Sequence, residues 1–126
     1  MSNAQTRDQR RANDAWQAIE RIDRHEDRAH IVRAAKKLPI RIHTAGLGHA
    51  VQFVNAKKKT RDLGPLISCW VLEGKGEDLV KAVREGTADS LRRHTNEALA
   101  WLQWFNRFAE AKFPKDFHAD DEGVAE

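Results

Sequence analysis

The sequence has a single cysteine, Cys69, and no apolar run approaching the roughly 20 residues needed to cross a bilayer. One cysteine excludes an internal disulfide, so a reducing, cytoplasmic location is the default expectation. Residues 1–14 contain no apolar stretch, and we therefore expect neither a secretory signal nor a role at a membrane. The 126 residues, 40% of them apolar, suffice for one domain with one hydrophobic core.

Reactive side chains do not cluster along the chain. No two histidines have the i, i+4 spacing that places two ligands on one helix face, and Cys69 has no cysteine partner for a zinc site. Gly46 and Gly48 lack the third glycine of a dinucleotide-binding loop, because position 51 is a valine. Cys69 lies in an apolar segment, where we expect a buried, inert thiol. We therefore predict no catalytic residue, no metal site, no cofactor and no small-molecule substrate.

Apolar residues recur at helical spacing in every periodic stretch, and no stretch alternates as a half-buried strand does. The predicted fold class is all-α, a compact bundle of about five to six helices with a long C-terminal helix. The expected helices cover residues 6–23, 28–38, 40–56, 66–72, 79–85 and 89–113. Together they form a single domain, residues 1–126, with a structured core of about residues 6–114. Residues 115–126 form an acidic C-terminal tail, and we expect the part from residue 117 to residue 126 to be loose.

Three positions interrupt the helical pattern between residues 28 and 56. Leu38-Pro39 marks either a kink or the restart of a helix, because proline disfavours helix at the residue before it but suits a first turn. Gly46 and Gly48 each cost about 1 kcal/mol relative to alanine in a helix interior. We interpret these two glycines first as sites where another backbone approaches closely, and second as local distortion.

The helix expected over residues 89–113 is apolar around about 220° of its circumference, whereas a surface helix needs a stripe of roughly 100°. One interpretation is a central core helix that is packed on both sides. Another is that the edge formed by Trp101, Trp104 and Phe108 faces a partner protein, because aromatic residues are enriched at such interfaces. The two interpretations are compatible.

Positive charge is concentrated in residues 28–61, which hold nine lysines and arginines and no acidic residue, although the net charge of the chain is only +3. Such a region favours nucleic acid, with contacts to phosphates rather than to bases. The residues expected to bind RNA are Lys36, Lys37, Arg41, Lys57, Lys58, Lys59 and Arg61. A solvated basic surface is the simpler alternative. If the helix over residues 39–56 is straight, these groups lie at opposite ends of about 27 Å and need not form one patch.

Two segments carry a family resemblance. The first reads Lys36-Lys37-Leu38-Pro39, then Thr44-Ala45-Gly46-Leu47-Gly48 and Val51-Gln52-Phe53-Val54; the second runs from Arg93 to Ala111 and includes Trp101 and Trp104. In this order they resemble the small subunits of CRISPR type III-B (Cmr) effector complexes, over about residues 12–113. The family-motif residues, with packing roles, are Leu38, Pro39, Gly46 and Gly48. Ala45 stands where the family is expected to have asparagine, so the hydrogen bonds of that side chain are lost.

The resemblance implies a non-catalytic subunit in antiviral defence. It implies that copies stack beside the backbone subunits that hold the guide RNA, with a basic face along the channel where target RNA pairs. Cleavage would belong to other subunits. The implied partners are other Cmr subunits, copies of the chain itself, guide RNA and target RNA. An alternative is a helical protein–protein adaptor whose basic region binds an acidic partner without contacting RNA. An RNA-processing enzyme is a third hypothesis, which lacks catalytic residues.

Overall fold

The computed structural model describes residues 4–119, and within them it contains seven α-helices and no strand. The helices are α1 (Arg7–Ile22), α2 (Arg28–Ala45), α3 (Leu47–Asn55), α4 (Leu63–Val71), α5 (Leu79–Glu85), α6 (Ala88–Lys112) and α7 (Pro114–Phe117). The predicted all-α class with a long C-terminal helix, α6, is confirmed.

The ends of the helices follow local capping chemistry. Thr6 caps α1 in a reciprocal capping box with Gln9, and Thr87 caps α6 in the same way with Ser90. In each box the two side-chain oxygens accept hydrogen bonds from backbone N–H groups that have no partner inside the helix. Asp78 caps α5 by accepting a hydrogen bond from the Val80 backbone. These caps explain why the helices begin close to the predicted positions.

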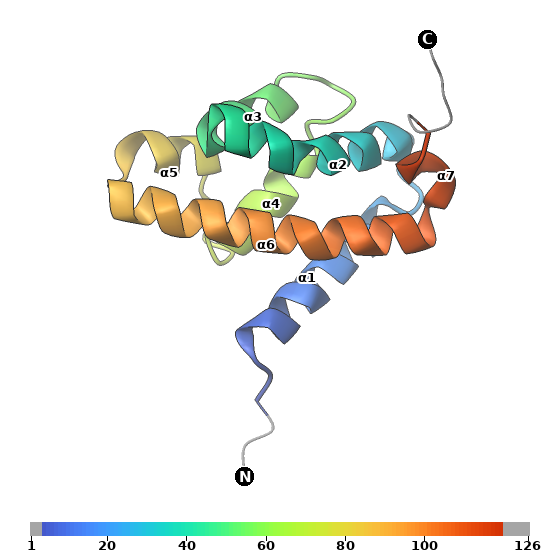
Figure 1. Cartoon of the computed structure of the whole chain (residues 1–126), viewed down its shortest axis with the longest axis horizontal. Coiled ribbons are helices and arrows are strands. Elements are labelled where there is room, and N and C mark those ends of the chain that lie inside the picture. Colours follow the sequence, from blue (N-terminus) through green and yellow to red (C-terminus); the bar gives the residue numbers. More distant parts are fainter. Residues whose placement is uncertain (1–3, 120–126) are drawn as a thin grey trace.

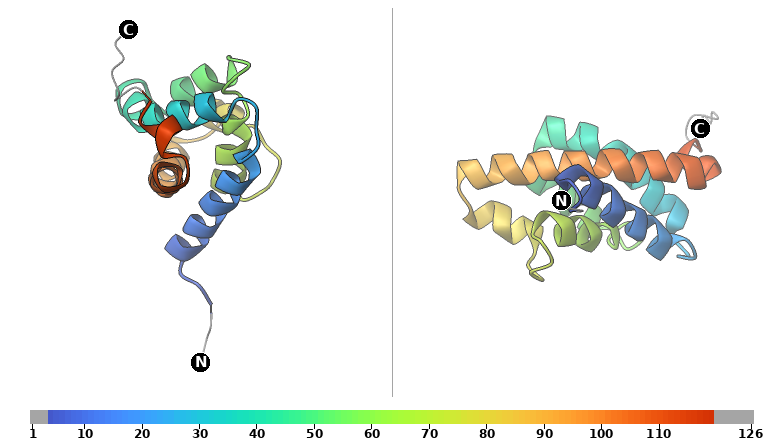
Figure 2. Two further views of the ribbon diagram at one scale, coloured as in Figure 1. Left: turned by 90° about the vertical axis from the view of Figure 1, so that its right-hand side faces the viewer. Right: turned by 90° about the horizontal axis from the view of Figure 1, so that it is seen from below.

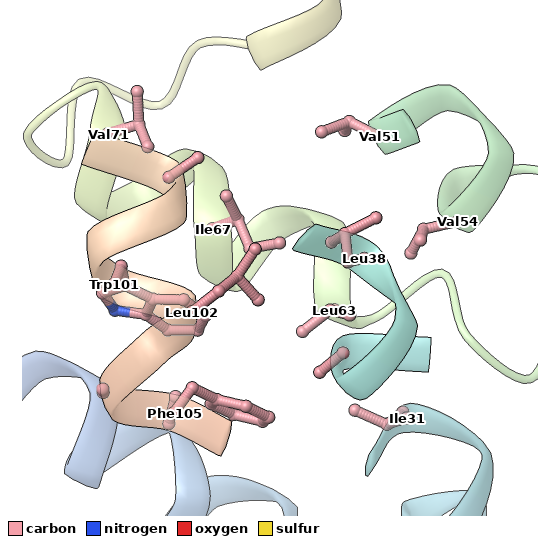
Figure 3. Packing of buried hydrophobic residues seen from close by; sticks show 14 of the residues in the cluster. Ile31, Leu38, Val51, Val54, Leu63, Ile67, Val71, Trp101, Leu102 and Phe105 are labelled. Atoms are coloured by element: carbon pink, nitrogen blue, oxygen red, sulfur yellow. The ribbon is translucent and has the colours of Figure 1, made fainter. Parts of the chain in front are cut away.

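Helix α6 is the central element of the bundle. It runs along the whole molecule, with α2 along one side and α1 crossing the other (Figures 1 and 2). Its buried residues Trp101, Leu102 and Phe105 point into a core shared with α2 and α4 (Figure 3). That core includes Ile31, Leu38, Leu63, Ile67, Val51 and Val54. The predicted two-sided packing of this helix is therefore confirmed.

Proline 39 lies inside α2, so the helix does not restart there. A proline at this position removes the backbone N–H that would donate to the carbonyl of Ala35, four residues earlier. The side chain of Asn106, on α6, takes its place: its Nδ2 donates to the Ala35 carbonyl oxygen at 2.9 Å. The neighbouring helix thus supplies the hydrogen bond that the proline removes.

The break between α2 and α3 occurs at Gly46 instead. Its backbone has φ 93° and ψ 160°, a combination that is essentially restricted to glycine. A Cβ on Gly46 would meet no other atom, so local conformation explains this glycine. At Gly48 the reason is proximity, since a Cβ there would lie 3.2 Å from Cγ1 of Val83 on α5. The contact at Gly48 is with a side chain rather than with the expected backbone.

Three sequence-based expectations need correction. Helix α4 begins at Leu63 rather than at residue 66, because Pro65 is tolerated in a first helical turn. Cys69 is exposed, since it lies on the outer face of α4 and not among its buried residues. The tail is ordered beyond residue 114, where Pro114 starts α7 and Phe117 packs against the core. The remainder of the predicted loose tail, residues 120–126, lies outside the described residues.

Candidate nucleic-acid interface

A row of basic residues follows one side of α2. Arg33, Lys37 and Arg41 are spaced four residues apart, which places them along the same face of the helix. At the end of this row the guanidinium of Arg41 lies 4.0 Å from the ring centre of Phe53, on α3. The ammonium of Lys57 lies 4.2 Å from the same ring centre. We call these five residues, Arg33, Lys37, Arg41, Phe53 and Lys57, the basic face.

The chain reversal at Gly46 is what creates the basic face. In a straight helix Arg41 and Lys57 would lie sixteen residues apart, about 24 Å along the axis. Because the chain turns at Gly46, α3 packs back against α2, and both cations reach one aromatic ring. Phe53 is 42% exposed, so this ring and its two cations are accessible to a ligand. Two groups that the sequence placed at opposite ends of a helix therefore meet.

The turn after α3 holds the remaining lysines by short-range hydrogen bonds. Thr60 Oγ1 donates to the Val54 carbonyl at 2.8 Å, and the Arg61 backbone N–H donates to the Lys57 carbonyl at 2.9 Å. The far end of the turn is tied to the α1–α2 connection, where His25 Nε2 lies 2.7 Å from Asp62 Oδ2. The lysine-rich segment is therefore an ordered turn.

The predicted RNA-binding residues do not all share one environment. Lys37, Arg41 and Lys57 belong to the basic face, and Lys59 is exposed on the turn. Lys58 and Arg61 line a hollow at the α1–α2 connection. Three acidic residues also line this hollow: Glu26, Asp27 and Asp62. Residues 28–61 contain no acidic residue, but in the folded chain acidic side chains from neighbouring segments lie close to two of their basic residues.

Lys36 contacts the C-terminal segment of the chain itself. Its Nζ donates to the Phe117 carbonyl oxygen at 2.8 Å and lies 4.7 Å from the Phe117 ring centre.

Phe53 and Arg33 were not among the residues predicted for the site. Phe53 lies in the segment that carries the family resemblance, but its role depends on the turn at Gly46. Arg33 was one of the nine basic residues and could have been found from its spacing to Lys37.

The predicted partner-facing edge of α6 is partly wrong. Trp101 is fully buried, and its Nε1 donates to Asp14 Oδ1 at 2.8 Å, so it contributes to the core. Trp104 and Phe108 are half-buried, and their rings stack at 5.6 Å between centres. Trp16 on α1 extends this group, 37% exposed and 5.3 Å from Phe108 between ring centres. We call Trp16, Trp104 and Phe108 the aromatic patch. The predicted edge lacked Trp16, because this residue comes from α1.

A partly buried ionic cluster around Glu97 joins α1, α4 and α6, away from the basic face. The carboxylate of Glu97 accepts hydrogen bonds from Arg7, from Arg11 and, at 2.9 Å, from Trp70 Nε1. Burial acts to raise the pKa of Glu97, but these three donors outweigh burial and lower the pKa to about 2. Glu97 is therefore ionised at any physiological pH, and it serves structure rather than proton transfer.

Over residues 4–119, no group of three or more histidine, cysteine, aspartate or glutamate side chains is arranged to hold a metal ion. In the same residues, no helix combines the length and the apolar character that spanning a membrane requires.

Comparison with known proteins identifies the family. A model of the family described as CRISPR-associated protein (Cas_Cmr5) matches residues 7–112, which include all of α1 to α6. The chain belongs to the Cas_Cmr5 family. The resemblance inferred from the two sequence segments is confirmed.

A comparison with a named sequence and a comparison with a solved structure, both from Thermus thermophilus, support this assignment. A Thermus thermophilus protein named CRISPR system Cmr subunit Cmr5 is 32% identical over 112 residues, which cover 84% of this chain and 95% of that protein. The crystal structure of a CRISPR-associated Cmr5 family protein from Thermus thermophilus has a TM-score of 0.74 at 32% identity. That match covers 86% of this chain and 97% of the other. The Cas_Cmr5 fold therefore extends over nearly the whole described chain.

Proposed function

We propose that this chain is a non-catalytic subunit of a Cmr ribonucleoprotein of CRISPR defence, and that its basic face contacts RNA phosphates. Membership of the Cas_Cmr5 family, and a relative named as a Cmr subunit, support the assembly. The observation that carries the RNA contact is the convergence of Arg41 and Lys57 on the exposed ring of Phe53. The partners are other Cmr subunits, copies of this chain, guide RNA and target RNA, in the cytoplasm.

The basic face suits phosphates better than bases. Guanidinium groups bind phosphate oxygens through paired charge-assisted hydrogen bonds, and lysine acts as a point charge. Arg33, Lys37 and Arg41 are spaced about 6 Å apart along α2, a distance comparable to that between successive phosphates of one strand. Because the basic face presents no set of amides or carboxylates for base edges, we expect binding that depends on salt and not on sequence.

The aromatic patch is the proposed contact with another protein subunit. Trp16, Trp104 and Phe108 lie on α1 and α6, whereas the basic face lies on α2, α3 and the turn that follows. Figure 1 shows α1 and α2 on opposite sides of α6. A subunit with this arrangement contacts RNA on one side and protein on another, which suits a spacer within a ribonucleoprotein.

The test is RNA binding by a charge-neutralised variant with a matched control. We expect K37Q/R41Q/K57Q to bind single- and double-stranded RNA at least about tenfold more weakly at low salt, and the slope of log affinity against log salt to fall by about one per lost contact. The control K75Q/K81Q/R93Q removes three exposed cations outside the basic face and is expected to bind almost as tightly as the parent chain.

Both variants are to be measured alone and assembled with the other Cmr subunits. Equal RNA affinity in the two triple variants would contradict the assignment of the basic face. Assembly with the subunits, combined with no RNA affinity at low salt in any form, would instead favour the protein–protein adaptor. Affinity that varies strongly with RNA sequence would contradict the phosphate-only mode.

A further inference from the structure

In the aromatic patch, Trp16 differs from the other three tryptophans of the chain. The indole N–H groups of Trp70, Trp101 and Trp104 each donate to a carboxylate of α1 or α6, at 2.9, 2.8 and 3.1 Å. Trp16 is 37% exposed, and its indole N–H has no acceptor among the described residues. A tryptophan that is buried usually finds an acceptor for this group. A partner that covers the patch must therefore bring an acceptor to Trp16.

Two exposed cations lie at the aromatic patch. The ammonium of Lys112 lies 5.2 Å from the ring centre of Trp16. Arg107 directly precedes Phe108 and follows Trp104 by three residues, so it borders the patch on the surface of α6. Neither cation has an ion-pair partner within residues 4–119. Because covering an unpaired charge is costly, a partner over the patch must supply carboxylates for Arg107 and Lys112.

Arg107 also lines a hollow on the other side of α6. The hollow has a volume of about 580 Å³ and lies between α2 and α6, which run side by side in Figure 1. Among the residues that line it, the acidic one, Glu110, pairs with His118 at 3.0 Å. Its apolar lining consists of Pro39, Leu99 and Phe117. A segment that crosses α6 can therefore place apolar side chains in the hollow and on the patch, with a carboxylate at Arg107 between them.

From these groups we infer that the aromatic patch and the hollow bind an acidic amphipathic segment of another protein. RNA fits this surface less well, because Asp8 accepts the hydrogen bond from Trp104 at one edge and Glu20 is exposed one turn after Trp16. RNA would carry a row of phosphates past these two carboxylates, whereas a protein can place single carboxylates beside the cations. The inference deepens the proposed subunit contact and rests on it, since it names the chemistry of the segment that the other subunit brings.

The first experiment uses the isolated full chain, with a synthetic helical peptide of leucine and glutamate as the probe. Two-dimensional NMR spectra resolve the indole N–H signal of each tryptophan. We expect the Leu/Glu peptide to shift the signal of Trp16 and not that of the buried Trp101. At low salt it should bind at least about fivefold more tightly than a Leu/Gln peptide of equal length, and a Leu/Lys peptide should bind more weakly still. Equal affinity for the three peptides, or no shift at Trp16, overturns the inference.

Substitutions test the cations and the indole separately. We expect R107E/K112E to bind the Leu/Glu peptide at least about tenfold more weakly than the parent chain. The control K75E/K81E reverses two exposed cations elsewhere and should lose less than about twofold. Trp16→Phe keeps an aromatic ring but removes the N–H donor, and a loss of about three- to tenfold is expected. Equal losses in R107E/K112E and K75E/K81E would contradict the role of the two cations.

Assembly with the other Cmr subunits separates this inference from the proposed function. A photo-crosslinking residue at Ala111, which is exposed two turns after Trp104, should capture an acidic segment of a different subunit. Crosslinks to RNA or to a second copy of this chain, or equal assembly by R107E/K112E and the parent chain, overturn the inference. Selective binding of the Leu/Glu peptide by a chain that does not assemble would refute the proposed function and support the acidic-segment site.

Discussion

At the scale of single residues, the Asn106 side chain stabilises a helix to which it does not belong. It donates to the Ala35 carbonyl, whose usual donor is missing at Pro39. A buried carbonyl without a donor costs about 1–3 kcal/mol, so this one hydrogen bond allows α2 to continue past the proline. The other end of the amide, Oδ1, is buried and has no hydrogen-bond partner among the described residues. The net gain therefore falls at the lower end of that range.

We expect Asn106→Ala to lower the free energy of unfolding by about 1–2 kcal/mol, because it leaves the Ala35 carbonyl without its donor. Urea denaturation measures the change. The matched background is the variant Pro39→Ala, which restores the backbone donor. In that background Asn106→Ala should lower the free energy of unfolding by at least about 0.5 kcal/mol less than it does in the parent chain. An equal cost in both backgrounds would show that Asn106 acts through packing alone.

At the scale of the elements, the break between α2 and α3 depends on one glycine. Gly46 has a backbone conformation that side-chain-bearing residues avoid, and α3 starts at the next residue. The sequence predicted one continuous helix across Gly46, because the apolar residues on both sides of it keep helical spacing. Whether an interruption ends a helix depends on tertiary contacts. Asn106 replaces the hydrogen-bond donor that is missing at Pro39, whereas no contact restores a helical conformation at Gly46.

We expect Gly46→Ala to destabilise the protein by about 1–3 kcal/mol, since the φ of 93° is strained for any residue with a Cβ. Gly48→Ala is the control two residues away. There the Cβ must be accommodated 3.2 Å from Val83, but alanine gains helix propensity, so we expect a change of less than about 1 kcal/mol. Thermal unfolding of the two variants tests the contrast. A smaller loss at Gly46 than at Gly48 would contradict this account of the break.

Most elements could be predicted because their signals are local. Thr6 and Thr87 begin helices through hydrogen bonds within three residues, and the apolar face of α6 predicted its central position. The missed element, α7, is four residues long and depends on distant contacts from Arg28 and Lys36. The exposure of Cys69 was missed for a related reason, since an apolar segment does not reveal which of its faces is covered.

At the scale of the whole molecule, Glu97 connects three helices. Arg7 and Arg11 come from α1, Trp70 from α4 and Glu97 from α6, so a single carboxylate joins segments about 90 residues apart. Arg7 is half exposed, and solvent screening limits the strength of its pair. We expect the ionised carboxylate to contribute about 1–2 kcal/mol to the free energy of unfolding near neutral pH.

The contribution of Glu97 should disappear in acid. Its pKa is about 2 in the folded chain and near 4.5 in the unfolded chain, so the stabilisation is fully present above pH 4.5 and is lost as the pH falls toward 2. Glu97→Gln is therefore expected to be less stable than the parent chain at pH 7 and equally stable near pH 2. Urea denaturation between these values measures the difference, and a difference independent of pH would exclude the ionised carboxylate as its source.

The composition of the proposed RNA-binding surface could be predicted from the sequence, but its arrangement in space could not. A run of basic residues identified Lys37, Arg41 and Lys57, yet it could not separate them from Lys58 and Arg61, which lie beside acidic residues of the α1–α2 connection. That separation depends on which turns meet in space. Likewise, the apolar pattern of α6 placed Trp101 on a partner-facing surface. In the structure α1 packs over Trp101 and buries it.

The ring of Phe53 has one more consequence, which concerns the entropy of binding. Free arginine and lysine side chains each carry about 2 kcal/mol of rotamer entropy, and a ligand that immobilises them must offset its loss. Arg41 and Lys57 are already restricted by their contacts with the ring before any ligand arrives. An anion that binds between them meets a pair of charges at a preset separation, whereas the exposed Lys59 must be ordered during binding.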